Sequence, residues 1–138
     1  MKNLIFTTLF ILGLAFMAKS QYVVKSQINE ESVPGKVKSN FNTKFPDAKV
    51  LNWYKIGATT YEALIKNGKQ TELVVFDWEG RVGEELIQVK GKEFPKDKKA
   101  ALEKKYKDLK ITHVFKVKGT NNFVVEGDND GKIYQIKP

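Results

Sequence analysis

The chain has 138 residues, and 24 lysines and arginines against 16 aspartates and glutamates give it a formal net charge of +8. It contains no cysteine, which excludes disulfides, a thiolate nucleophile and a lipid-anchored cysteine. Arginine occurs once, as Arg81, and the lysines are interleaved with glutamates. Because nucleic-acid sites favour arginines and clustered basic faces, we expect a solvated basic surface and no nucleic-acid partner.

The first twenty residues have the pattern of a signal peptide. Lys2 precedes the apolar run Leu4–Met17, and Ala18 and Ser20 place small residues before a cut ahead of Gln21. The run has about 14 residues, which as a helix span about 21 Å of a hydrocarbon core about 30 Å thick. We therefore expect cleavage between Ser20 and Gln21, no membrane span afterwards, and a periplasmic or secreted protein of one domain.

Residues 21–31 are polar and are expected to form a flexible lead-in or a short strand. Ser32 is placed to cap a helix, Pro34 suits its first turn, and Pro46 ends it. Apolar residues repeat every four positions along this helix and form one stripe, at Val33, Val37, Phe41 and Phe45.

Strands rich in β-branched and aromatic residues follow, and turn residues separate them. Asn67-Gly68 predicts a type I′ hairpin. A second helix is expected from Pro95 to about Lys107. The strands that the pattern delimits are Lys49–Ile56, Tyr61–Lys66, Lys69–Phe76, Val82–Lys90, Lys110–Val117 and Lys132–Ile136, and about seven are expected in all.

The chain contains a duplication. Val33–Ile56 aligns with Phe94–Val117 at an offset of 61 residues without a gap, and later positions continue the match after small slips. We expect two repeats, 32–93 and 94–138, in the order αββββ–αβββ, with the last strand missing from the second. The predicted fold class is α+β, with two helices on one face of an antiparallel sheet whose other face is partly open.

The expected partner-binding residues lie on that open face. Carrying the alternation of Lys110–Val117 into the first repeat turns Trp53 and Lys55 away from the helices. If Ile56 opposes Tyr61, Lys55 pairs with Glu62 and Trp53 with Leu64 across the hairpin. Trp78 occupies a turn, where a large ring is unusual. The predicted partner-binding set is Trp53, Lys55, Glu62, Leu64 and Trp78; the alternative is that the chain itself covers Trp53 and that Trp78 shields a turn.

Catalytic and metal-binding patterns are weak. His113, the one histidine, is flanked by Ile111 and Phe115 and is interpreted as structural. Adjacent Glu84 and Glu85 point to opposite faces of a strand, so they do not form an acid/base pair. The run 128–131, Asp-Asn-Asp-Gly, lacks the glutamate that completes a calcium loop and fits a hairpin turn. We expect no enzyme, no cofactor and no metal.

A series of short motifs occurs in a fixed order along residues 32–136. The motifs are Val33-Pro34, Phe41, Phe45-Pro46-x-Ala48, Val50-x-x-Trp53, Tyr61-Glu62-Ala63, Asn67-Gly68, Phe76-Asp77-x-x-Gly80 and Phe94-Pro95. In their order and spacing they resemble the PepSY-like family of exported bacterial proteins, also called β-lactamase-inhibitor-protein-like. The resemblance implies tandem helix-plus-sheet repeats and, from its inhibitor members, capture of a protein on a concave sheet.

Two functions are therefore expected from the sequence. The first is a non-enzymatic module that binds a protein, for example a hydrolase that it inhibits, through the open sheet face. The alternative is a carrier of a small ligand or an envelope component, with a pocket between helices and sheet near His113 and Tyr54.

Overall fold

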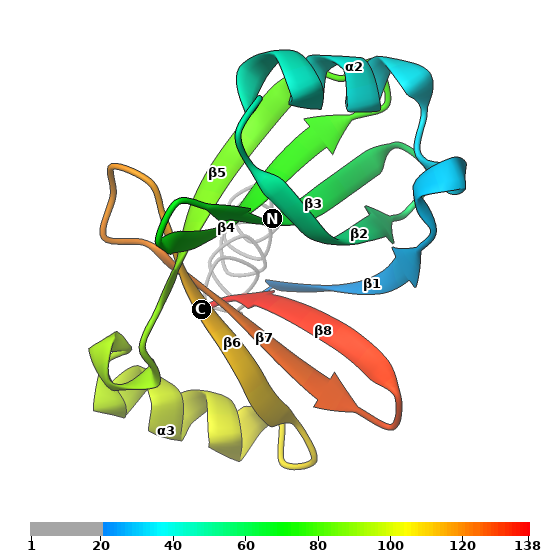
Figure 1. The fold of residues 1–138 in the computed structure, drawn as a ribbon. Coiled ribbons are helices and arrows are strands. Elements are labelled where there is room, and N and C mark those ends of the chain that lie inside the picture. The colour runs from blue at the N-terminus through cyan, green and yellow to red at the C-terminus, as the bar shows by residue number, and fades with distance from the viewer. Residues whose placement is uncertain (1–20) are drawn as a thin grey trace, which may run out of the picture.

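The computed structural model describes residues 21–138, in which eight antiparallel strands close into a barrel (Figure 1). Each strand pairs with its neighbours in sequence, and β1 pairs with β8 to close the ring. The strands are β1 (Gln21–Ile28), β2 (Lys49–Ile56), β3 (Thr60–Asn67), β4 (Gln70–Asp77), β5 (Val82–Val89), β6 (Lys110–Val117), β7 (Phe123–Asn129) and β8 (Lys132–Lys137).

The predicted fold class is wrong. The sheet is not an α+β layer with an open face, because its two ends meet and its inner face becomes the barrel lumen. The segment left as a lead-in or short strand is β1, and it supplies the closing pairs from Gln21 with Lys137 to Lys25 with Ile133. An eight-stranded barrel has an interior that side chains just fill, so closure hides the face that was expected to be open.

The helices lie outside the barrel on opposite sides (Figure 1). Each follows a short 3-10 turn: η1 (Glu30–Ser32) precedes α2 (Gly35–Lys44), and η2 (Gly91–Glu93) precedes α3 (Lys96–Lys105). Proline rather than serine stands at the N-cap of α2, and Ser32 ends the 3-10 turn instead. The predicted stripe is confirmed in its essentials, since Val33, Val37 and Phe41 are buried.

The duplication is visible as two equal units. Each runs strand, 3-10 turn, helix and three strands, so β1 to β4 form one unit and β5 to β8 the other. The offset of 61 maps the ends of β1 onto those of β5, and β1 fills the place of the strand that the second repeat had seemed to lack.

Three apolar clusters hold the barrel together. One joins α2 to the outer faces of β2, β3 and β4, around Trp53 and Phe76. A second joins α3 to β6, β7 and β8, around Phe94 and Val125. The third fills the lumen with Tyr54, Leu64, Leu73, Leu86, Phe115 and Val124.

Two β-bulges reverse the predicted faces. The pairing of β2 with β3 shifts between Val50 and Asn52, and that of β6 with β7 shifts between Ile111 and His113. An extra residue inverts the alternation beyond it. Val50, before the shift, and Trp53, after it, therefore both pack toward α2, although Trp53 was expected on the face away from the helices.

The predicted signal peptide lies outside the described residues, so cleavage and export stay predictions. Within residues 21–138, no helix has the length and apolarity needed to cross a membrane.

Candidate functional site

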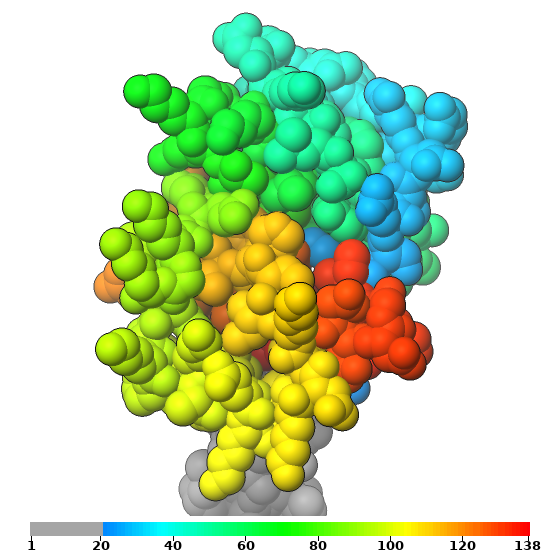
Figure 2. All heavy atoms as spheres, turned by 60° about the horizontal axis from the view of Figure 1, so that its bottom comes forward, coloured from blue at the N-terminus to red at the C-terminus, as the bar shows by residue number. Residues whose placement is uncertain are grey.

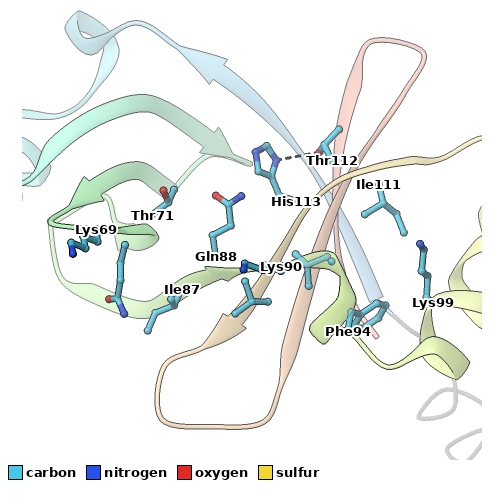
Figure 3. A pocket seen from close by; sticks show the side chains of 14 residues that line it. Lys69, Thr71, Ile87, Gln88, Lys90, Phe94, Lys99, Ile111, Thr112 and His113 are labelled. Atoms are coloured by element: carbon cyan, nitrogen blue, oxygen red, sulfur yellow. Dashed lines mark hydrogen bonds between the residues drawn. The ribbon is translucent and has the colours of Figure 1, made fainter.

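A groove of about 700 Å³ opens where β5 and β6 diverge at one mouth of the barrel (Figure 3). The two strands pair only from Leu86 with Val117 to Val89 with Val114, and then η2 leads β5 away toward α3. The tip of the β3–β4 hairpin forms the far wall. The lining is Lys69, Gln70, Thr71, Ile87, Gln88, Val89, Lys90, Gly91, Phe94, Lys99, Ile111, Thr112, His113 and Val114.

The charge of the groove has one sign. Lys69 in the β3–β4 turn, Lys90 between β5 and η2, and Lys99 in α3 line it together with His113. Among its 14 described lining residues none is acidic. A site with several ammonium groups and no carboxylate favours an anion, and the surrounding protein strengthens that attraction.

The floor of the groove is apolar. Ile87, Val89, Ile111 and Val114 contribute to it, and the ring of Phe94 lies below Lys99 in Figure 3. Gln88 and Thr71 add hydrogen-bonding groups at the edge of the lumen. Such a lining suits an organic molecule that has an apolar body and an anionic end.

The other half of the barrel shows what makes this groove distinctive. At the offset of 61, Gln88 and His113 correspond to Gln27 and Asn52, and there Gln27 Nε2 donates to Asn52 Oδ1 at 3.0 Å. Gln88 and His113 point toward one another without such a bond in Figure 3. His113 instead has Nδ1 3.2 Å from Thr112 Oγ1 and stacks on Phe115.

Below this mouth a charged network is buried in the lumen. Lys25 Nζ donates to Glu62 Oε1 at 2.9 Å and also to Glu126 Oε2. Gln135 Nε2 donates to Glu62 Oε2 at 3.0 Å and to Glu126 Oε2 at 3.0 Å. All four residues are buried, and every buried side-chain nitrogen and oxygen of residues 21–138 has a hydrogen-bond partner.

Two carboxylates share one ammonium group in this network, and burial and ion pairing together shift the pKa values of Glu62 and Lys25. Burial raises the pKa of Glu62, although Lys25 opposes the rise. Burial also lowers the pKa of Lys25, but Glu62 and Glu126 together outweigh it and the net shift is upward. The folded protein therefore holds protons here more tightly than the unfolded chain does.

His113 lies between the groove and the network. It lines the groove and is about one-third exposed, and its Nδ1 is 3.9 Å from Glu126 Oε1. Tyr54, expected beside it in a pocket, lies in the lumen instead, with Lys25 Nζ 4.0 Å from the centre of its ring.

The residues predicted to bind a partner do not form one surface. Trp53 is only 5% exposed and packs against Phe41 of α2, 5.6 Å between ring centroids. The three-residue turn after Ile56 shifts the expected register by one position, so Lys55 faces Tyr61 and Trp53 faces Ala63.

Glu62 and Leu64 point into the lumen on the other side of the sheet, where Glu62 binds Lys25. Trp78 does lie exposed, at 51%, in the β4–β5 turn with Lys36 Nζ 5.9 Å from its ring centre. The structure thus offers no open sheet face around Trp53, and recognition of a protein partner stays a prediction.

The sequence reasoning missed Lys25 and Gln135. Lys25 lies between the exposed Val24 and Ser26, and Gln135 is a polar residue that alternates with the buried Ile136 along a strand, so the local pattern does not predict that either side chain is buried. The duplication holds the only signal: the equivalents of Lys25, Glu126 and Gln135 in the other unit are Leu86, Leu64 and Leu73, all buried.

No family model matches this chain, and searches of curated proteins and of solved structures found no match either. The resemblance to PepSY-like proteins stays a prediction. The geometry of the groove is therefore the basis for the functional proposal.

Proposed function

We propose that this protein is a binding protein that holds a small organic anion in the groove between β5 and β6. The observation that carries the proposal is the combination of three lysines and a histidine with an apolar floor and no carboxylate among the described lining residues. The lysines place charge around the rim, and the half-buried Ile87, Val89 and Ile111 supply the surface for an apolar body.

The location of the groove supports binding rather than a purely structural hollow. Its walls come from β5, β6, the β3–β4 hairpin and α3, so the site is held by rigid elements of both units. The equivalent residues Gln27 and Asn52 hydrogen-bond to one another, whereas Gln88 makes no such bond to His113, whose Nδ1 lies 3.2 Å from Thr112 Oγ1. A ligand with acceptor atoms can use these groups.

The test compares two fluorescent probes with the same aromatic rings. We expect 1-anilinonaphthalene-8-sulfonate, which is anionic, to bind saturably at one site. N-phenyl-1-naphthylamine lacks the sulfonate and should bind at least about tenfold more weakly, because one charge-assisted contact contributes about 1.5 kcal/mol.

The matched variants use the duplication. Lys99→Gln should raise the dissociation constant of the sulfonate about tenfold. Lys38→Gln removes the same charge at the equivalent position of the other unit and should leave binding unchanged. Equal affinity for the two probes, or equal effects of the two variants, would overturn the proposal.

A further inference from the structure

A second surface lies away from the groove, on the outer face of β1 and β8. Tyr22 and Val24 of β1 are 54% and 41% exposed, although both are apolar side chains on a regular strand. Val24 pairs with Tyr134 of β8, and the Tyr22 ring lies 5.4 Å from Tyr134 and 6.0 Å from Tyr106. We call Tyr22, Val24, Tyr106 and Tyr134 the tyrosine patch.

The equivalent seam, between β4 and β5, has carboxylates at these positions instead. Val24 of β1 corresponds to Glu85 of β5, which pairs with Lys44 at 3.7 Å. Tyr134 of β8 corresponds to Glu72 of β4, since Asn67 pairs with Gln70 as Asn129 pairs with Lys132. Glu72 is buried and accepts a hydrogen bond from Asn67. One seam thus carries two partnered carboxylates where the other carries an aliphatic and an aromatic side chain. The fold itself does not require the exposed apolar residues.

Basic residues outnumber acidic ones beside the tyrosine patch. Lys105 and Lys107 line a hollow of about 290 Å³ together with the three tyrosines, and Asp108 is the one acidic residue in its described lining. The segment 90–110, which includes α3, has nine lysines against four acidic residues, a net charge of +5, whereas the equivalent segment 29–49 has +1. In Figure 2 the yellow side chains of α3 and the residues after it project from the face next to the red of β8.

We propose that the tyrosine patch and the lysines around it bind the headgroup layer of an anionic membrane. Tyrosine has an apolar ring and a polar tip, which suits the boundary between acyl chains and headgroups, and Val24 adds apolar area. Lysines near such a surface are attracted to anionic lipids. A second copy of the chain is a poor occupant, because each copy presents the same positive charge.

The experiment is sedimentation with vesicles of phosphatidylcholine alone or with a third of phosphatidylglycerol. It uses the chain from Gln21 onward, which holds the complete barrel, so that the apolar run Leu4–Met17 cannot itself enter the bilayer. We expect binding to the anionic vesicles that weakens as salt increases, and at least about tenfold weaker binding to the neutral ones.

Two variants separate the contributions of charge and ring. Lys105→Gln with Lys107→Gln should weaken binding at least about tenfold, since each lysine near the surface contributes about fivefold. Tyr22→Ser should weaken binding severalfold even at low salt. Lys36→Gln with Lys49→Gln removes the same charge from the first unit and should have little effect. Thermal unfolding checks that all variants remain folded.

Three results would overturn the proposal: no binding to anionic vesicles, equal binding to both kinds of vesicle, or equal losses in the two lysine pairs. A fourth contradicting result would come from sedimentation velocity without lipid. If the protein is a dimer and Tyr22→Ser dissociates it, the tyrosine patch binds a second copy of the chain and not a membrane. The proposal does not depend on the groove, because its variants lie outside the groove lining.

Discussion

Lys25 is the one cation among the four buried residues of the lumen network, and it binds both carboxylates. Its ammonium group is buried with two carboxylates and one amide, and it has no contact with bulk solvent to compensate for a lost partner. Burying charges costs several kcal/mol each, and good geometry at best recovers that cost. We therefore expect the network to favour one arrangement of the lumen side chains and to make stability depend on pH, and to add little to the net free energy of folding.

Stability should respond to pH through Glu62. Its pKa is raised in the folded state, so the extra stability from protonation is full below the ordinary value of 4.5. It declines as the pH rises above 4.5 and is gone above the folded pKa. We expect the free energy of unfolding of the wild type, minus that of Glu62→Gln, to fall over this range. Urea unfolding from pH 4.5 upward measures it, and a difference that rose with pH would contradict the assignment.

At the scale of elements, turns decide where strands begin and which faces they show. The three-residue turn 57–59 sets the register of β2 with β3, and it shifts the partner of Trp53 by one residue. The Asn67-Gly68 hairpin is present, but the predicted I′ turn is wrong: of its two turn residues, Gly68 has a positive φ of 65° and Lys69 does not. A II′ turn has this pattern.

Gly80 joins the β4–β5 turn to α2 and should tolerate no side chain. Its φ is 89°, and a Cβ there would lie 2.5 Å from the Lys36 carbonyl oxygen and 2.7 Å from Asn40 Nδ2. Gly57 has a φ of 58° with nothing within 4 Å of the same position, so it serves as the control.

We expect Gly57→Ala to cost about 1 kcal/mol of unfolding free energy through backbone strain alone. Gly80→Ala should cost at least twice that, because α2 must also move away from the turn. Chemical unfolding of the two variants gives the comparison. If the two variants lost the same unfolding free energy, α2 would be able to move away from the turn without cost, which would contradict the prediction.

Much of the element order could be predicted from the sequence, and closure could not. The bounds of Lys49–Ile56 and Lys110–Val117 are confirmed, because β-branched runs between turn residues are local signals. Pairing of β1 with β8 joins the two ends of the described chain, and no local pattern encodes it. Of the residues that line the groove, only His113 was predicted from the sequence to lie near a ligand pocket. The lysines could not be predicted, because in the sequence they look like any solvent-exposed lysine and only the fold brings them together.

At the scale of the whole molecule, the two units differ in what they place in the lumen. At four equivalent pairs of positions, one unit has an apolar residue where the other has a charged or polar one. The first unit has Leu64 and Leu73 where the second has Glu126 and Gln135. The second unit has Leu86 and Val124 where the first has Lys25 and Glu62. Each unit therefore contributes both apolar and polar residues to the lumen, within one repeated backbone.

This difference predicts a non-additive mutant series. Lys25→Leu alone leaves two buried carboxylates without their cation and should cost about 3–5 kcal/mol. Adding Glu62→Val, Glu126→Leu and Gln135→Leu gives each position the apolar residue of its equivalent in the other unit. The fourfold change should recover most of that loss, since apolar replacements of buried ion networks are often neutral or stabilising. Urea unfolding of the single and fourfold variants decides it. Costs that simply add would contradict the interpretation.

The seam between β8 and β1 has a consequence for how such a chain arises. Gln21 lies opposite Lys137, and the corresponding place between the two units is bridged by the short link from Asp77 to Val82. Either unit alone would be a four-stranded sheet with two unpaired edge strands, whose free backbone groups can pair with any other exposed strand. A protein that consisted of one unit would have to form a homodimer to close the barrel. Tandem fusion of two units replaces that association with a covalent link.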